Sequence, residues 1–149
     1  MKLTVHLNEA HGSYFDGFTP SKAELTDAGT YDLPDFHYVP DRIIPGMTDD
    51  EALENQELYA RDILNAVYEQ LNVGGDLVPA QPYTEAYRAA GGRSLSVGDL
   101  VTLDGTEGNF LGFRATYAVD KIGFKKVLCA SLVIRRGLAR AERNVEAFA

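Results

Sequence analysis

The sequence contains one cysteine, no tryptophan and no long apolar run. The single cysteine, Cys129, excludes a disulfide within these 149 residues, which is typical of proteins in a reducing compartment. No segment approaches the ~20 consecutive apolar residues that a membrane-spanning helix needs. The first residues also lack the basic and apolar layout of a signal peptide. We therefore expect a cytoplasmic protein that does not enter the membrane.

Motifs that would identify an enzyme are also missing. There is no G-x-S-x-G nucleophile turn, no phosphate-binding loop that ends in Lys-Ser/Thr, and no glycine spacing of a dinucleotide site. Two groups of chelating residues are present: His6, Glu9 and His11, and Asp99, Asp104 and Asp120. The first lacks the i, i+4 histidine pair of a helical zinc site, and the second falls on turn signals. We expect no catalytic residues, no metal and no cofactor.

The charge is unevenly distributed along a chain of single-domain size. The net charge is −8, with −9 in residues 1–60 and +1 in residues 61–149. A chain of this length buries about two-thirds of its surface on folding. The acidic half is either a solvated surface that keeps the protein soluble or a face presented to a basic partner.

The first half of the chain predicts one strand and one long helix. Apolar and polar residues alternate in 1–7, which indicates a strand. Residues 8–17 are turn-like, and a short helix is expected at 21–25. At 48–72, Thr48 and Glu51 form a capping box ahead of an apolar stripe that starts at Leu53, and Gly74-Gly75 ends the helix.

After a proline-bounded connector with a short edge strand at 77–78, a brief helix is expected at 84–90. Residues 91–134 then predict a β-meander: a strand from Leu95 to Leu103 bent at Gly98-Asp99, a long loop at 104–112, a strand at 113–119, and a third strand from Gly123 to Ile134. Cys129 falls in that third strand, so we expect its side chain to be buried.

The segment from Gly91 to Val127 also resembles a known family. Gly92-Arg93-Ser94-Leu95-Ser96-Val97-Gly98-Asp99, followed by Tyr117-Ala118-Val119-Asp120 and Ile122-Gly123-Phe124, is similar to the YodL-like domain. The resemblance implies a protein of a phage, plasmid or other mobile element. It implies no catalytic residue, because the family has no established enzymatic activity.

The resulting fold prediction is a single α+β domain over residues 1–149. A mostly antiparallel meander packs against one long amphipathic helix, and a short basic helix ends the chain. The segments are an acidic, aromatic-rich strand and loop region (1–47), the long helix (48–73), the meander (91–134) and the terminal helix (135–149).

Function by protein binding is the first hypothesis. Aromatic and acidic residues are mixed within 13–38, and tyrosine gives large contact area at low entropic cost. Most of these aromatics are expected to pack on the sheet. The candidate binding residues are Tyr14, Phe15, Asp16, Asp32, Asp35, Tyr38 and Asp41. The partner would have a basic surface, and one form of this hypothesis is counter-defence by mimicry of DNA.

Two alternatives remain open. The first is a nucleic-acid-binding regulator that uses the only basic cluster, Arg135, Arg136, Arg140 and Arg143, although the acidic chain lacks the broad basic field of such proteins. The second is a small hydrolase or metal-dependent nuclease that uses His6, Glu9, His11, Asp99 and Asp120.

Overall fold

The computed structural model describes residues 1–34, 48–72, 79–106 and 112–147, and the elements of this part form an α+β fold. The strands form one antiparallel sheet in the order β2-β1-β3-β4-β5, as the sequence predicted for the fold class. The strands are β1 (Lys2–Asn8), β2 (Leu25–Asp32), β3 (Leu100–Asp104), β4 (Arg114–Val119) and β5 (Phe124–Lys126). The helices are α1 (Ser13–Asp16), α2 (Asp49–Leu71), α3 (Pro82–Ala89) and α4 (Ala130–Ala147).

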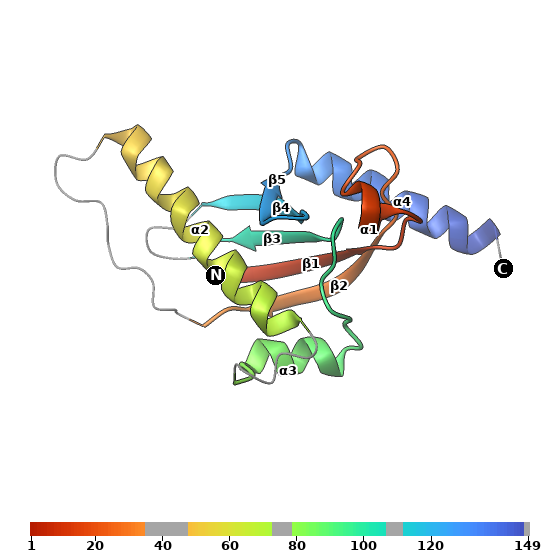
Figure 1. Ribbon diagram of the computed structural model, residues 1–149, viewed down its shortest axis with the longest axis horizontal. Helices are drawn as coiled ribbons and strands as arrows, with labels where there is room; N and C mark the ends of the chain where they lie inside the picture. The colour runs from red at the N-terminus through yellow and green to blue at the C-terminus, as the bar shows by residue number, and fades with distance from the viewer. Residues whose placement is uncertain (35–47, 73–78, 107–111, 148–149) are drawn as a thin grey trace.

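Strand β1 lies inside the sheet, because it pairs with β2 along one edge and with β3 along the other. Leu3, Val5 and Leu7 are buried in the main core together with residues of α2 and α3. A smaller core on the other face includes Leu25 and Leu100, with residues of α4 packed against it. Helices therefore cover both faces of the sheet, and α2 runs diagonally across one of them (Figure 1).

Helix α2 begins where the capping signal predicts. Thr48 is the N-cap, and its Oγ1 accepts a hydrogen bond from the backbone N–H of Glu51 at 3.2 Å. Its apolar stripe packs on the sheet through Ala60, Ile63, Leu64, Val67 and Leu71. Leu53 was wrongly placed in that stripe: it is 59% exposed, because it lies about two turns before Ala60, the first buried residue of the stripe. The expected helix stop at 74–75 and the edge strand at 77–78 lie outside the described residues.

The region after β5 corrects the sequence prediction. The expected third strand through Ile134 is only three residues long, and α4 begins at Ala130. Cys129 has a φ of 53°, which turns the chain from the sheet into the helix. Its side chain is exposed, so the predicted burial of this thiol is wrong. The terminal helix is also longer than expected, because residues 130–134 belong to it.

Helix α4 packs against the sheet through a glycine. A Cβ on Gly137 would lie 2.7 Å from both Cγ and Cδ1 of Leu25, which is closer than real Cβ contacts. Gly137 is buried, and Ile134 and Leu138 pack against the same small core. The glycine lowers intrinsic helix propensity, but it allows α4 to approach β2 closely.

The segment between β1 and α2 also differs from the prediction. The helix expected at 21–25 is a turn that leads into β2, which periodicity did not reveal, and a four-residue helix occupies 13–16 instead. Strand β2 forms because its backbone pairs with β1, with an irregular register between Thr4 and His6. Phe18 and Tyr31 are partly buried against the cores as expected, whereas Tyr14 and Phe15 are exposed.

The bend predicted in the first meander strand is a turn. Residues 96–99 form it, with the N–H of Asp99 donating to the carbonyl of Ser96 at 3.0 Å, and β3 starts only at Leu100. Gly98 takes a φ of 97°, which favours glycine. Across the described residues, no helix is both long and apolar enough to cross a bilayer.

Candidate functional site

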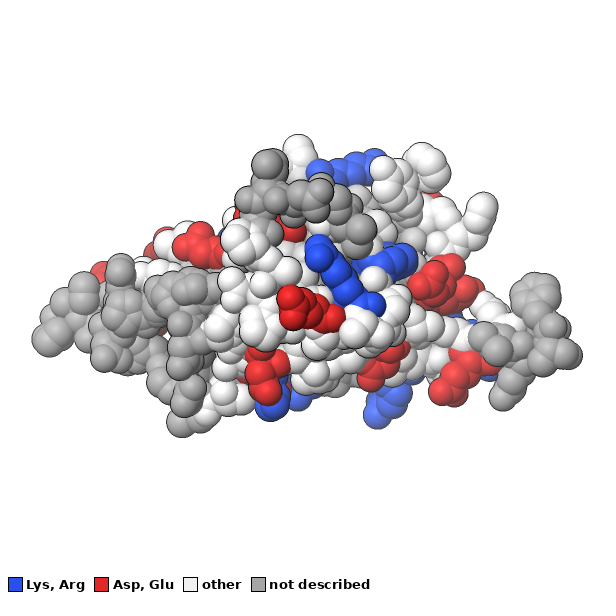
Figure 2. Space-filling view, turned by 90° about the horizontal axis from the view of Figure 1, so that it is seen from below, with Lys and Arg blue, Asp and Glu red and all other residues white. Residues whose placement is uncertain are grey.

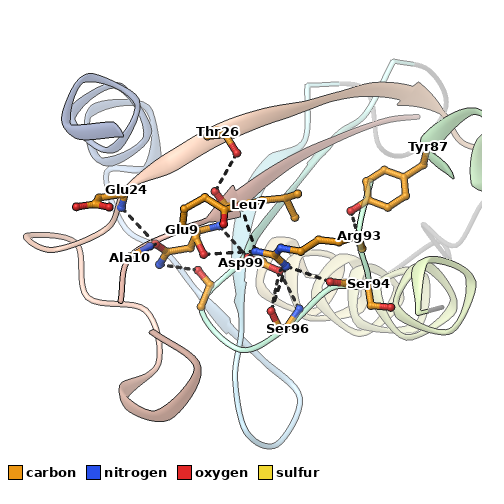
Figure 3. Close-up of polar contacts among 12 residues, drawn as sticks. Leu7, Glu9, Ala10, Glu24, Thr26, Tyr87, Arg93, Ser94, Ser96 and Asp99 are labelled. Atoms are coloured by element: carbon orange, nitrogen blue, oxygen red, sulfur yellow. Dashed lines mark hydrogen bonds and ion pairs between the residues drawn. The ribbon is translucent and has the colours of Figure 1, made fainter. Parts of the chain in front are cut away.

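The segment that carries the family resemblance is organised around one buried ion pair. Asp99 stands at the start of β3 with its side chain 0% exposed, and Arg93 reaches it from the loop that follows α3. The guanidinium binds the carboxylate in a bidentate manner, with Nη1 2.7 Å from Oδ2 and Nη2 2.9 Å from Oδ1 (Figure 3). Planar forks of this kind are the strongest arginine–carboxylate contacts.

The carboxylate of Asp99 has further donors that complete its coordination. The backbone N–H of Asn8 donates to Oδ1 at 2.8 Å, and the backbone N–H of Ser96 donates to Oδ2 at 2.8 Å. Arg93 also donates to the carbonyl oxygens of Ser94 and Asn8. Hydrogen bonding to Asp99 raises the pKa of Arg93 above its ordinary value, although burial acts in the opposite direction.

This network connects the end of β1 to the start of β3. The hydroxyl of Ser96 also donates to Oδ2 at 3.3 Å, so the two oxygens of Asp99 accept five hydrogen bonds from the chain itself, and the side chain serves the fold and not a substrate. Tyr87 holds the other side of the loop, because its hydroxyl donates to the carbonyl of Arg93 and its ring packs against Gly92. The segment from Arg93 to Asp99 therefore supplies the ion pair that links this loop and the start of β3 to β1.

The residues weighed as metal ligands do not come together. His6 is buried in the sheet, His11 is exposed beyond β1, and Glu9 lies 3.6 Å from Arg93. Asp99 is occupied as above, Asp104 lies at the far end of β3, and Asp120 lies in the β4–β5 turn. No group of three potential ligands exists among the described residues.

His6 is a buried polar residue with an unusual environment. It is 7% exposed, and among the described residues its Nδ1 has no hydrogen-bond partner. Burial lowers the pKa of His6 below 6.5, and the charge of Asp27 opposes this shift. The imidazole is therefore kept neutral inside the sheet.

The predicted binding residues are divided between two ends of the molecule. Tyr14, Phe15 and Asp16 form α1, beyond the C-terminal end of β1, and all three are exposed. Asp32 lies opposite Lys2, at the N-terminal end of β1, and Lys2 Nζ is 2.8 Å from its Oδ1. The hydrogen bond and charge of Lys2 lower the pKa of Asp32. Asp35, Tyr38 and Asp41 lie outside the described residues.

Exposed apolar side chains lie on α1 and on the segments beside a cavity that Asp16 of α1 also lines. Tyr14 and Phe15 are 63% and 72% exposed, and their rings meet edge to face with centroids 5.3 Å apart. A cavity of about 330 Å³ lies beside them, between the 16–20 segment and the strands β4 and β5. Ile122 in the β4–β5 turn is 93% exposed, and Leu128 on the cavity wall is 79% exposed. We call Tyr14, Phe15, Ile122, Leu128 and this cavity the α1 surface.

The acidic half does not form one uninterrupted face in the described part of the chain. Glu9, Asp32 and Glu57 each form an ion pair, with Arg93, Lys2 and Lys126 respectively. Glu24 accepts a hydrogen bond from Asn144 of α4. On the face shown in Figure 2, lysine and arginine side chains lie between the aspartates and glutamates. The charge asymmetry of the sequence is therefore partly compensated in space.

The arginine cluster is divided along α4. Arg135 and Arg136 are exposed, whereas Arg140 bonds the carbonyl oxygens of Pro20 and Ala23. Arg140 and Arg143 share a second cavity with Lys22 and His11. Sequence reasoning missed this grouping, because its members lie about 120 positions apart.

Sequence reasoning also missed two polar contacts that anchor α2. Tyr117 on β4 donates its hydroxyl to Glu57 Oε2 at 2.9 Å. Gln70 joins α2 to α3, because its Nε2 donates to the carbonyl of Pro79 and its Oε1 accepts from the N–H of Gln81. A polar residue on an apolar helix stripe is the only sequence signal for such contacts.

Comparisons with protein-family models, curated proteins and solved structures found no match. The resemblance to the YodL-like family therefore stays a prediction.

Proposed function

We propose that this protein acts by binding another protein, and that the α1 surface is the centre of the contact. The observation that carries the proposal is the placement of its exposed apolar residues. Among the described residues, seven large apolar side chains are exposed, and Tyr14, Phe15, Ile122 and Leu128 belong to the segments around one cavity. Contiguous exposed apolar area rimmed by polar residues marks interaction sites on soluble proteins.

The chemistry of the α1 surface suits a protein ligand. Paired aromatic rings supply rigid contact area, and aromatic residues are enriched at the centres of protein interfaces. The cavity has apolar walls that include Phe18, Val119 and Val127, so it suits one apolar side chain of the partner. Asp16 and Asp120 also line it, and so do Lys125 and Lys126, so the rim offers partners for both basic and acidic groups beside that side chain.

This proposal keeps the protein-binding part of the sequence hypothesis and its basic partner. It does not extend to mimicry of DNA, because Glu9, Asp32 and Glu57 are paired with basic residues of the same chain. A role in a mobile element and action in the cytoplasm rest on the resemblance and on composition, and they stay predictions.

The only cysteine of the chain allows a direct test. Cys129 is exposed and adjoins Leu128, so a maleimide–benzophenone attached to it places a photocrosslinker at the edge of the α1 surface. The captured protein is then purified, and its affinity is measured for Phe15→Ser and Ile122→Ser variants. Loss of a central aromatic or aliphatic contact lowers affinity by about tenfold or more.

The matched control is Leu58→Ser. Leu58 is an equally apolar residue, 56% exposed, but it lies on α2 and lines neither cavity described above. Its substitution should leave the affinity unchanged. Equal losses for Phe15→Ser and Leu58→Ser, or no loss for either α1-surface variant, would contradict the proposal.

A further inference from the structure

The second cavity lies where α4 meets the turn after β1 and the segment before β2. Its volume is about 430 Å³, which is within the range of small-molecule sites. The side chains that matter for its chemistry are His11, Ser21, Lys22, Glu24, Arg140 and Arg143. They come from three parts of the chain: the turn after β1, the segment before β2, and the second half of α4.

Arg140 is held in a fixed position at this cavity. Its Nη1 donates to the carbonyl oxygens of Pro20 at 2.8 Å and Ala23 at 3.0 Å. Both bonds use one nitrogen, so the guanidinium plane is fixed while Nε and Nη2 have no acceptor among the described residues. A guanidinium oriented in advance loses less entropy when it binds a ligand.

The charges in the cavity are not balanced by the described part of the chain. Lys22, Arg140 and Arg143 line it, and none of them forms an ion pair with a described carboxylate. Glu24 is the one acidic residue of the lining, and its Oε1 accepts a hydrogen bond from Asn144. Like charges that share a cavity repel one another, so an anion in the cavity would relieve this repulsion.

We propose that this cavity binds a small molecule that carries a phosphate monoester. Two arginines supply planar forks that match phosphate oxygens, and Lys22 adds a mobile ammonium. The hydroxyl of Ser21 and the ring of His11 add further donors at the wall. The net charge of the whole chain is −8, which disfavours the binding of a long polyanion. A small anion would contact only this cavity, where the basic residues are concentrated.

Isothermal titration in phosphate-free buffer tests the proposal, with inorganic phosphate, adenosine monophosphate and adenosine as probes. We expect both phosphate-bearing probes to bind and adenosine not to bind. Arg143→Gln should lower the affinity for both by about tenfold, because it removes a charged hydrogen-bond donor. Glu24→Gln should raise the affinity, because it removes the only negative charge among the described residues of the lining and keeps an acceptor for Asn144.

Arg135→Gln is the matched control. Arg135 is exposed on the same helix and does not line the cavity, so this variant makes the same charge change and should alter affinity by less than about twofold. Circular dichroism of every variant shows whether the fold is kept. Lys22→Gln provides a second cavity variant from outside α4, should Arg143→Gln unfold.

Three results would overturn the proposal. The first is that neither phosphate nor adenosine monophosphate binds the intact protein. The second is an equal loss of affinity for Arg135→Gln and Arg143→Gln. The third is binding of a 5′-phosphorylated oligonucleotide alone, weakened equally by both arginine variants, which would place a nucleic acid along α4 instead.

Discussion

The most informative perturbation of the fold is Asp99→Ala. Asp99 is fully buried, and its carboxylate accepts bonds from Arg93, from the N–H of Asn8 and from the N–H of Ser96. The alanine variant removes every one of these bonds at once. It leaves a guanidinium and two backbone N–H groups without their acceptor at the point where β1, the loop after α3 and β3 meet (Figure 3).

The expected loss follows from the burial of the two partners. Removal of one member of a buried ion pair costs about 3–5 kcal/mol, because the other charge is left without compensation. The Arg93 side chain is 37% exposed, so water can solvate one side of its guanidinium. We therefore expect the lower end of that range, about 3 kcal/mol. For a chain of this size this corresponds to a decrease in Tm of about 6–12 °C.

Urea unfolding and thermal unfolding, both followed by circular dichroism, measure this loss. Asp104→Ala is the matched control, because Asp104 lies at the other end of β3, is 44% exposed and stands 3.7 Å from Arg114. Exposed pairs of this kind contribute about 0–1 kcal/mol. Asp99→Asn keeps the shape and one acceptor oxygen, so it should fall between the two alanine variants.

A double-mutant cycle with Arg93→Ala separates the ion pair from the backbone contacts. We expect a coupling energy of about 1–3 kcal/mol between Arg93 and Asp99, since they are in direct contact. The reasoning is refuted if Asp99→Ala is no more destabilising than Asp104→Ala. It is also refuted if the cycle shows additivity, because the bidentate contact would then contribute nothing specific.

Two further predictions concern His6 and Gly137. Because burial puts the pKa of His6 in the folded state below its unfolded value of 6.5, the unfolded state binds more protons in acid, and stability should fall as the pH decreases below 6.5. Equilibrium unfolding between pH 7.5 and pH 5 should show a smaller decrease for His6→Gln than for the intact protein, and an identical decrease would exclude His6 as the cause. Gly137→Ala should destabilise the protein by about 1–3 kcal/mol through overpacking against Leu25, despite the higher helix propensity of alanine. Ala139→Gly, at an exposed position of the same helix, measures the difference in helix propensity between alanine and glycine without a packing effect. If Gly137→Ala is as stable as the intact protein, α4 can shift away from β2 and the overpacking argument is wrong.

Elements with strong local signals could be predicted from the sequence. The Thr48 cap and its apolar stripe set the position of α2, and alternation in 1–7 and 113–119 predicted β1 and β4. Strand β2 could not be predicted, because Asp27, Ala28 and Gly29 resemble a turn and the strand depends on pairing with β1. Residues 130–134 were predicted as a strand, since the apolar residues at 130, 132 and 134 have the period of a strand, and so short an apolar run does not distinguish a strand from a helix.

The candidate sites were harder to predict for a physical reason. The sequence named Tyr14 and Phe15 as candidate binding residues, but only the tertiary structure distinguishes them from Phe18 and Tyr31, which pack against the cores. Arg140 and Lys22 meet across more than a hundred positions, so their spacing along the chain carries no signal. Asp99 followed a glycine and resembled a turn residue, and its burial depends on Arg93 and Asn8 together.

The position of β1 between β2 and β3 has a consequence during synthesis. The N-terminal strand pairs with β3, which begins at Leu100, so one edge of β1 has no partner until the ribosome has added about a hundred residues. At about 5–20 residues per second, that interval lasts several seconds or more. Through that time Leu3, Val5 and Leu7 remain on an open strand of the nascent chain, a state in which chaperones would act and premature release would favour aggregation.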